Sequence, residues 1–273
     1  MTFREARNFL RRAGIETDAR DAALLFERFC GVPEAGLLTD PDREFDNPEL
    51  QNALQKRAER IPLQYLLGEW TFYRQRYRVT PDCLIPRQDT EVLVELAVRM
   101  LPPGAYFADL CTGSGCIAVS TLAERRDTRA IAVELSAKAL ELAEYNAALN
   151  GVKDRFNGVF GDVLKTLSFG DEKPAAILSN PPYIRSDVIP TLEREVQAEP
   201  RMALDGGADG MIFYRALVQI AREWLHKDGF CLFEIGFDQG EAIRKLARTV
   251  GFSCRIHRDL GGQDRVAELR RTF

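Results

Sequence analysis

The sequence predicts an α/β protein, in which a mostly parallel, doubly wound sheet with a C-terminal antiparallel hairpin follows a small helical domain. Three observations support this prediction. The first sixty residues have the apolar spacing of helices and no strand pattern, whereas after Asp89 short apolar strands alternate with helices. The chain of 273 residues is also long enough for one such sheet domain and one smaller domain.

Helices account for the N-terminal part of the chain. Thr2 and Glu5 have the spacing of a capping box, and Asn47 followed by Pro48 is typical of a helix start. Glycines are expected to end the first two helices. The three predicted helices run from Phe3 to Ala13, from Thr17 to the residue before Gly31, and from Asn47 to about Arg60.

The period of the pattern changes at Trp70. Between Trp70 and Leu84 side chains alternate between two faces, as in a strand, and Pro81-Asp82 predicts a turn. We interpret this stretch as a β-hairpin between two domains. The expected organisation is a helical domain over 1–69, a hairpin linker over 70–88 and an α/β domain over 89–273.

The α/β domain is expected to begin with a helix from Asp89-Thr90 to Met100. Ligands bind a doubly wound sheet at the carboxyl ends of its strands, so a site is expected in the segments that follow the strands. The predicted strands are Tyr106–Leu110, Ala130–Val133, Gly158–Phe160, Ala175–Leu178 and Phe230–Glu234, with a terminal hairpin at Ser253–His257 and Arg265–Leu269.

Composition argues against several classes of protein. Hydrophobic residues make up 45% and charged residues 29%, which is ordinary for a globular protein and argues against disorder. The net charge of −4 argues against bulk nucleic-acid binding. Six cysteines without a C-x-x-C pair, together with two histidines, argue against a metal site.

Neither a signal peptide nor a membrane span is recognisable in the sequence, which predicts a cytoplasmic protein. Charges in the first seven residues interrupt the apolar core that a signal peptide needs, and no stretch approaches the roughly 20 apolar residues of a membrane span. We expect a soluble monomer that associates neither with membranes nor stably with nucleic acid.

A glycine-rich loop follows the first predicted strand, where a tight turn brings the backbone close to a ligand. Gly113, Gly115 and Ala118 match the dinucleotide fingerprint G-x-G-x-x-A. Asp109, however, is anionic and suits the ammonium group of S-adenosylmethionine better than a pyrophosphate. A purely structural turn is the alternative. The residues predicted to bind this cofactor here are Asp109, Cys111, Thr112, Gly113, Ser114 and Gly115.

Acidic residues also follow the second and third strands. Glu134 can accept hydrogen bonds from both ribose hydroxyls or support the helix that starts at Ser136, and the two roles are compatible. Asp162 can accept from the adenine amino group, with Val163 beside the ring, or form a plain turn. Glu134, Asp162 and Val163 complete the predicted cofactor site.

The sequence Asn180-Pro181-Pro182-Tyr183 follows the fourth strand. Two prolines make a rigid segment without backbone donors, so the carbonyls of Asn180 and Pro181 are free to accept. With the Asn180 amide and the Tyr183 ring, they suit a planar –NH2 group of an amide or a nucleobase. The alternative is a proline-rich turn with a packed tyrosine. All four residues are predicted to bind substrate and to act in catalysis, and Asn180 also borders the cofactor.

The glycine loop and Asn180–Tyr183 together resemble the class I S-adenosylmethionine methyltransferases, whose domain is Rossmann-like. Three further motifs resemble the bacterial release-factor glutamine N5-methyltransferases, namely Gln64–Gly68, Leu84–Glu91, and Glu199–Leu204 with Gly206–Gly210. The chain departs from that family's pattern in four places: Gln88 stands for a proline, Cys111 for a glycine, Glu134 for an aspartate and Val163 for an aromatic residue.

This resemblance implies methyl transfer from S-adenosylmethionine to the glutamine of the Gly-Gly-Gln tripeptide in class I peptide chain release factors, in translation termination. It also implies that the helical domain recognises the substrate. We hypothesise that the Asn180 side chain and the Pro181 carbonyl accept both amide hydrogens, and that Tyr183 forms a wall of the slot.

Arginines offer a further contact to the protein substrate. Arg87, together with Arg74, Arg76 and Arg78, is predicted to receive an acidic or main-chain-rich partner. The alternative is a solvated strand face with one interdomain ion pair.

Other functions are alternatives at this point. A ribosomal-protein glutamine methyltransferase would use the same chemistry. A DNA adenine N6-methyltransferase also acts on a planar amine, but no target-recognition domain is recognisable. A non-catalytic binding module and a nicotinamide-dependent dehydrogenase are further alternatives, although nothing beside the loop supplies an acid or base for hydride transfer.

Overall fold

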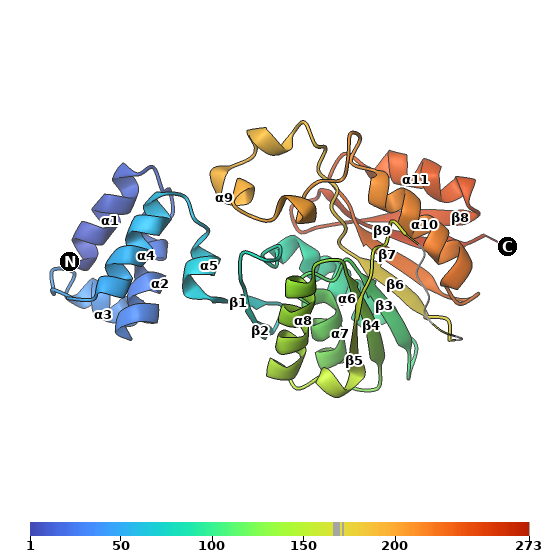
Figure 1. The fold of residues 1–273 in the computed structure, drawn as a ribbon, viewed down its shortest axis with the longest axis horizontal. Coiled ribbons are helices and arrows are strands. Elements are labelled where there is room, and N and C mark those ends of the chain that lie inside the picture. Colours follow the sequence, from blue (N-terminus) through green and yellow to red (C-terminus); the bar gives the residue numbers. More distant parts are fainter. Residues whose placement is uncertain (166–169, 171, 273) are drawn as a thin grey trace. The chain divides into compact units, whose positions relative to one another are not determined.

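The computed structural model describes residues 1–165, 170 and 172–272. The chain forms two compact units (Figure 1). The helical unit comprises Met1–Trp70 and Leu192–Ala198, and the sheet unit comprises Thr71–Thr191 and Glu199–Phe273. The segment Leu192–Ala198 therefore belongs to the helical unit, although the sequence pattern placed it in the α/β domain.

The helical unit confirms the predicted helix signals. The Thr2 hydroxyl accepts from the Glu5 amide at 3.1 Å while the Glu5 carboxylate accepts from the Thr2 amide at 2.8 Å, so the capping box is complete. Asn47 accepts from the Leu50 amide at 3.0 Å. Two short helices were not predicted because they span too few residues for a period to show. The helices are α1 Phe3–Arg12, α2 Asp18–Cys30, α3 Glu34–Thr39, α4 Pro48–Ala58, α5 Leu63–Leu67 and, from later in the chain, α9 Arg194–Gln197.

A buried ion-pair network joins α9 to the first helices. Arg57, which is 7% exposed, donates to Asp21 at 2.7 Å and to Glu195 of α9 at 3.0 Å. Arg60 reaches the same Glu195 oxygen at 3.2 Å. Because a buried guanidinium requires paired carboxylates, Glu195 ties its segment to the helical unit.

The sheet unit contains the predicted alternation of strands and helices. After the hairpin β1 Glu69–Phe72 and β2 Gln75–Arg78, its strands are β3 Tyr106–Leu110, β4 Arg129–Glu134, β5 Phe156–Phe160, β6 Ala176–Ser179, β7 Phe230–Glu234, β8 Phe252–Arg258 and β9 Asp264–Arg271. Its helices are α6 Glu91–Met100, α7 Cys116–Glu124, α8 Ala137–Leu149, α10 Ile212–Trp224 and α11 Gly240–Thr249. Its 3-10 turns are η1 Gln88–Thr90, η2 Lys153–Arg155, η3 Ile189–Thr191 and η4 Arg201–Ala203.

The strand order is β5-β4-β3-β6-β7-β9-β8, with parallel pairs from β5 to β7 and antiparallel pairs at β9 and β8. This confirms the predicted doubly wound sheet with a terminal hairpin. The chain moves outward from β3 to β5 and then returns to β6, so β3 and β6 flank the topological switch point, where such sheets bind ligands.

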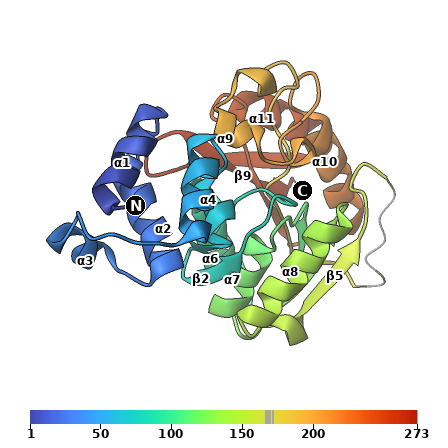
Figure 2. The same ribbon diagram turned by 60° about the vertical axis from the view of Figure 1, so that its left-hand side comes forward.

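Alternate side chains of the central strands enter two separate cores. Phe107 packs with residues of α6, α7 and α8 on one face, whereas its neighbour Ala108 packs with residues of α10 and α11 on the other. Helices α7 and α8 lie side by side along the first face (Figure 2). Helices on both faces explain why these strands are continuous apolar runs.

The predicted hairpin is present but shorter than the alternating stretch. Tyr73 adopts a φ of 57°, which breaks the extended chain into two four-residue strands. Tyr77 is fully buried in the sheet unit, where its hydroxyl lies 2.6 Å from that of Ser120. The hairpin therefore contributes a large side chain to this core.

The described residues contain neither a membrane-spanning helix nor a cluster of metal-binding side chains. Within that part of the chain, no helix is both long enough and apolar enough to cross a bilayer. Among the same residues, no group of three or more histidine, cysteine, aspartate or glutamate side chains is placed to hold a metal ion.

Candidate functional site

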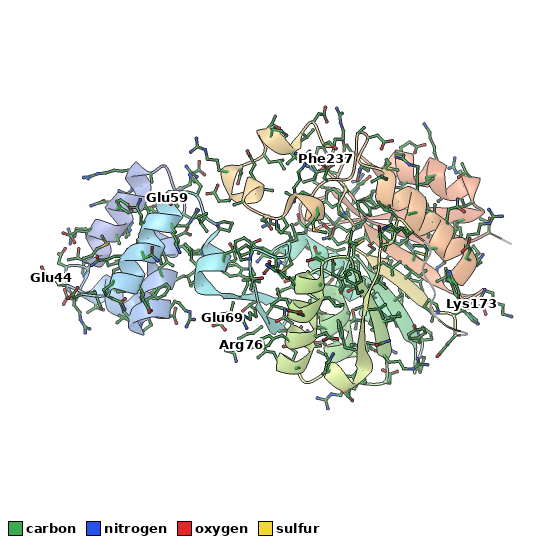
Figure 3. All side chains as sticks on the ribbon, in the orientation of Figure 1. Glu44, Glu59, Glu69, Arg76, Lys173 and Phe237 are labelled. Carbon is green, nitrogen blue, oxygen red and sulfur yellow. The ribbon has the colours of Figure 1, made fainter. Side chains whose placement is uncertain are left out.

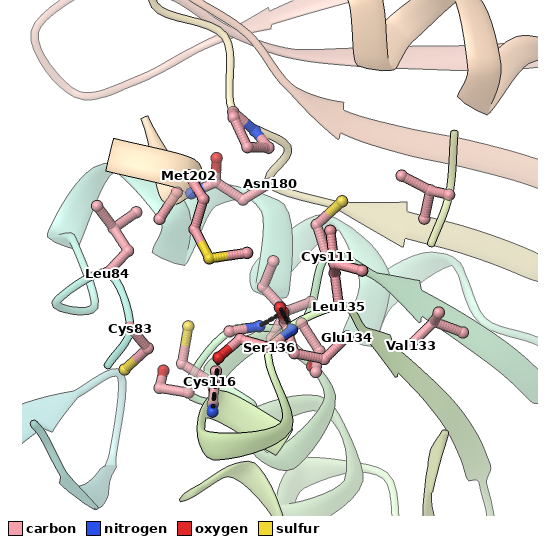
Figure 4. Close-up of a pocket in the computed structure, with 18 of the residues that line it drawn as sticks. Cys83, Leu84, Cys111, Cys116, Val133, Glu134, Leu135, Ser136, Asn180 and Met202 are labelled. Atoms are coloured by element: carbon pink, nitrogen blue, oxygen red, sulfur yellow. Dashed lines mark hydrogen bonds between the residues drawn. The ribbon is translucent and has the colours of Figure 1, made fainter. Parts of the chain in front are cut away.

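A cavity of about 300 Å³ lies in the sheet unit at the carboxyl ends of the strands (Figure 4). Its wall includes Cys111 after β3, Glu134 at the end of β4, Gly161 after β5 and Asn180 after β6. Its volume is at the lower end of the range of about 300–1,000 Å³ typical of small-molecule pockets. The cavity therefore lies at the topological switch point that the strand order indicates.

The glycine loop owes its shape to three residues with positive φ. The φ angles of Cys111, Gly113 and Gly115 are 61°, 56° and 81°, in the left-handed region that glycine favours. A Cβ on Gly115 would also lie 3.1 Å from that of Ala143 on α8. Cys111 occupies the position where the resembled family often has glycine, and it adopts the backbone conformation for which glycine is suited.

Asp109 lies behind this loop and does not line the cavity. Its carboxylate accepts from the Thr112 hydroxyl at 2.6 Å and from the Ala118 amide at 3.2 Å, which ties the loop to the start of α7. Burial raises the pKa of Asp109 to about 7. Its other oxygen, Oδ1, is buried without a partner among the described residues. Direct contact with an ammonium group stays a prediction, because the observed contacts hold the loop.

Glu134 bridges two loops at the cavity. One carboxylate oxygen accepts from the Gly113 amide and the other from the Ser136 amide, both at 2.9 Å (Figure 4). Ser136 in turn caps α8 through the Ala139 amide at 3.3 Å. The helix-supporting role weighed for Glu134 is therefore present, and its carboxylate still lines the cavity, where a diol could reach its remaining lone pairs.

The other predicted cofactor residues are divided between the wall and the interior. Asp162 accepts from the Leu164 amide at 2.9 Å, as in a turn, and both it and the buried Val163 line the cavity. Thr112, Gly113 and Ser114 line it too, whereas Gly115 does not.

The Asn180–Tyr183 segment is also divided. Asn180 and Pro182 line the cavity, but Pro181 and Tyr183 do not. The Asn180 amide nitrogen donates to the Thr90 hydroxyl at 3.2 Å, and the Tyr183 hydroxyl donates to Glu234 at 3.3 Å. Tyr183 packs against the core on the α10 face, so its ring forms no part of the cavity wall in this structure.

Arg87 lines the cavity and pairs with Glu199, a buried residue of the same unit. Both residues belong to the sheet unit, so this ion pair lies within one compact unit. Glu199 also accepts from the Ile85 amide at 2.9 Å, so it holds the chain around Arg87.

The arginines of the hairpin have mostly local partners. Arg74 pairs with Glu124 at 3.1 Å, and the guanidinium of Arg78 lies 5.2 Å from the ring centre of Tyr145. Arg76 is exposed on β2 (Figure 3). These contacts favour the solvated strand face over a substrate contact.

Several wall residues were not predicted. Helical or apolar patterns do not reveal that a side chain borders a cavity, although two of the missed stretches lie inside motifs that resemble the family. The residues missed include Leu84, Ile85, Thr90, Cys116, Ile117, Met202, Ala203 and Phe213.

The chemistry of the wall fits a cationic ligand better than a phosphate. Among the residues that the structure describes, the charged side chains that line the cavity are the four carboxylates Asp82, Glu134, Asp162 and Asp205 and the guanidinium of Arg87. A pyrophosphate would meet net negative charge there, whereas a sulfonium and an ammonium group would be attracted. The residues present therefore fit S-adenosylmethionine.

Two protein-family models match this chain, one in the helical unit and one largely in the sheet unit. The family model described as PrmC N-terminal domain matches residues 2–68, and the one described as methyltransferase small domain matches residues 88–229. A methyltransferase structure from Pyrococcus furiosus aligns with a TM-score of 0.53 at 17% identity, covering 71% of this chain and 86% of that chain, which shows a shared fold.

Two curated relatives match nearly the whole chain. A release factor glutamine methyltransferase from Geobacter sulfurreducens is 38% identical over 266 residues, covering 95% of this chain and 92% of the relative. One from Cereibacter sphaeroides is 40% identical over 266 residues, covering 96% and 94%. With this identity along both units, the chain belongs to the release factor glutamine methyltransferase family.

Proposed function

We propose that this protein transfers a methyl group from S-adenosylmethionine to the side-chain N5 of the glutamine in the Gly-Gly-Gln motif of class I peptide chain release factors. The observation that carries the proposal is the pairing of β3 with β6. Leu110 pairs with Ser179, whose hydroxyl donates to the Leu110 carbonyl at 2.6 Å, so the glycine loop and Asn180 start side by side on one cavity.

The cofactor would be held by the residues already on the wall. Glu134 would accept from the ribose hydroxyls, Asp162 from the adenine amine, and the glycine loop would enclose the amino-acid portion. S-adenosylmethionine supplies an electrophilic methyl group on a sulfonium. The carboxylates of the wall favour that sulfonium cation over the product S-adenosylhomocysteine, because the sulfur becomes uncharged when the methyl group is transferred.

The Asn180 segment would prepare the nucleophile. An amide nitrogen is a weak nucleophile because its lone pair is delocalised, so its position and the charge that develops on it matter most. The Asn180 side-chain oxygen, on the cavity wall, would accept one amide hydrogen and orient the nitrogen. The Pro181 carbonyl, whose residue does not line the cavity in this structure, would accept the other when substrate is bound. No strong general base is needed, because the amide proton becomes acidic only as the methyl group arrives and is then released to water.

Substrate recognition and cellular setting belong to the same proposal. The helical unit matches the PrmC N-terminal domain model and is proposed to bind the release factor. We expect a cytoplasmic monomer that does not bind nucleic acid stably, which size-exclusion chromatography and a DNA gel-shift assay would test.

The test uses S-adenosylmethionine labelled on its methyl group. Four substrates are offered: a purified release factor, the same factor with its Gly-Gly-Gln glutamine changed to alanine, ribosomal proteins, and duplex DNA. Label on the intact factor alone supports the proposal. Label on both factors equally, on ribosomal protein in preference to the factor, or on DNA, contradicts it.

A further inference from the structure

Asn146 of α8 is a fully buried polar residue that does not line the cavity. Strand β2 lies beside this helix (Figure 1). The Asn146 Oδ1 accepts from the Arg78 amide of β2 at 2.8 Å, and its Nδ2 donates to the Arg78 carbonyl at 3.1 Å. The same Nδ2 donates to the Ser114 carbonyl of the glycine loop at 2.9 Å. Asn146 therefore joins the hairpin to the glycine loop through their main-chain atoms.

The main chain of β2 fixes the orientation of the Asn146 amide. The Arg78 N–H group can only donate, so it requires the Asn146 oxygen, and both hydrogens of the amide nitrogen then face acceptors. In the opposite orientation the oxygen would face two carbonyls and the nitrogen would face an N–H group. The donation to Ser114 is therefore set by main-chain groups that neither rotate nor titrate.

The Ser114 carbonyl depends on a side chain for its hydrogen bond. Ser114 is 2% exposed and lines the cavity. It precedes Gly115, the N-cap of α7, and the first bond of that helix runs from the Val119 amide to the Gly115 carbonyl at 2.8 Å. The Ala118 amide, one position earlier, donates to the Asp109 carboxylate at 3.2 Å. Because a buried carbonyl without a partner is costly, the donation from α8 stabilises this conformation of the loop.

Helix α8 also supports the glycine loop one turn before Asn146. A Cβ on Gly115 would lie 3.1 Å from the Cβ of Ala143 and 3.3 Å from its Cα, so the loop backbone packs directly on the helix. Ala143 and Asn146 are three positions apart and therefore share one face of α8. This face holds the loop at two successive points, by close packing at Gly115 and by a hydrogen bond at Ser114.

We propose that Asn146 is a positioning residue for cofactor binding, which holds the Ser114 carbonyl and thereby the glycine loop in the conformation that receives S-adenosylmethionine. The inference rests on the proposed function, because it concerns the site in which that cofactor would bind. A preorganised loop lowers the cost of binding the cofactor, whereas transfer of the methyl group depends on Asn180. Asn146 therefore affects the Kd and KM of the cofactor more than kcat.

The first test removes the Asn146 amide. Asn146→Ala should raise the Kd of S-adenosylmethionine by about 10-fold in calorimetry, because the Ser114 carbonyl loses its donor and the loop is no longer preorganised. KM for the cofactor should rise similarly, while kcat and KM for the release factor change less than about twofold. All proteins are measured below their thermal transitions. An unchanged Kd, or a lower kcat with unchanged Kd, would overturn the proposal.

Asn146→Asp isolates the donated hydrogens. It keeps the shape of the side chain and an acceptor for the Arg78 amide, but a carboxylate cannot donate to the Ser114 carbonyl. It should weaken cofactor binding at least as much as Asn146→Ala, and wild-type binding would count against the proposal. Calorimetry does not involve the release factor. A wild-type protein that binds the cofactor but leaves the factor unmethylated would therefore contradict the proposed function and not this inference.

Asn150→Ala is the matched control. Asn150 lies one turn further along α8, and its Nδ2 donates to the Arg76 carbonyl at 2.9 Å, so it holds the same strand as Asn146. Its other side-chain hydrogen bond among the described residues goes to the Asn146 carbonyl, and neither bond reaches the glycine loop. This variant should keep the wild-type Kd. A rise in Kd as large as that of Asn146→Ala would mean that loosening β2 is sufficient, and would refute the role of the Ser114 bond.

Hydrogen exchange in the wild-type protein decides the matter if the Asn146 variants do not fold. A ligand stabilises the groups that are coupled to its site, so S-adenosylmethionine should slow exchange of the Arg78 amide, although Arg78 does not line the cavity. The reference is the Tyr73 amide in the same hairpin, which donates to Glu91 of α6 at 2.8 Å. Its exchange should change less. Equal slowing of the two amides, or no slowing at Arg78, would overturn the inference.

Discussion

The two segments that meet at the cavity, the glycine loop and Asn180–Tyr183, hold their shapes in different ways. They follow neighbouring parallel strands. The glycine loop is shaped by its own backbone angles, with three positive φ values within five residues. Its anchors, Asp109 and Glu134, lie close to it in sequence or on the next strand.

Asn180–Tyr183 is instead held by residues far away in the chain. A Cβ on Gly206 would lie 2.7 Å from Tyr183 Cα, and one on Gly210 would lie 2.5 Å from the Tyr183 carbonyl oxygen. The Gln239 amide donates to that same oxygen at 3.3 Å. The glycine-loop side of the cavity is thus locally encoded, whereas the Asn180 side depends on long-range packing.

The largest effect is expected at Asn180, on the side of the cavity that depends on long-range packing. Asn180→Ala should raise the transition-state free energy by about 2–4 kcal/mol, because it removes an acceptor for the charge that develops on the amide nitrogen. Binding of S-adenosylmethionine should change much less. Steady-state kinetics with the release factor measure the first quantity and isothermal calorimetry the second. The exposed Asn157→Ala on β5 is the control, and near-normal turnover by Asn180→Ala would contradict the assignment.

Gly210→Ala tests the close packing beneath Tyr183. The added methyl group would meet the Tyr183 carbonyl at 2.5 Å in a backbone with φ of 70°, so we expect about 2–3 kcal/mol of lost stability and a reduced kcat. Gly251→Ala has a similar φ of 80° but no neighbour within 4 Å, so it should cost only about 1 kcal/mol. Denaturant unfolding compares the two, and equal losses would show that contact with Tyr183 is unimportant.

Asp109→Asn tests the glycine-loop side of the cavity through the pH dependence of protein stability. The pKa of Asp109 is about 7 in the folded protein against an ordinary 3.8, so the unfolded chain loses this proton first. Stability therefore falls as pH rises from about 4 to 7. Asparagine does not titrate, so the melting temperature of the variant relative to wild type should be more favourable at pH 8 than at pH 5.

Asp209→Asn should behave in the opposite way. Hydrogen bonding to Arg215 lowers the pKa of Asp209 to about 2, so its contribution to stability is present above the ordinary pKa and is lost as pH falls toward 2. This variant should therefore lose stability relative to wild type at neutral pH. The same direction of change in both variants would contradict the buried-charge account of Asp109.

The smallest effect is expected at Cys111. Its φ of 61° strains a residue with a Cβ, and Cys111→Gly would relieve that strain at some cost in the entropy of the unfolded chain. We expect a gain of up to about 1 kcal/mol, measured by thermal unfolding without ligand. A clear loss would mean that packing of the Cys111 side chain outweighs the backbone strain.

Local patterns were sufficient for most of the fold. The capping box at Thr2, the cap at Asn47, and the apolar runs of β3 and β7 predicted elements at or near their observed bounds, because caps and periodicity depend on residues a few positions apart. The glycine loop and Glu134 were found for the same reason. Short elements such as α3 and α5 were missed because they contain less than two periods.

The tertiary structure alone decided what contacts residues distant in sequence make. It placed Asp109 behind the glycine loop, turned Tyr183 toward Glu234 instead of the cavity, and joined Glu195 to Arg57 of the helical unit. It also brought Thr90 to Asn180, ninety positions apart. A sequence pattern reports which face of its own element a residue occupies, but the partner on that face is determined by how the elements pack.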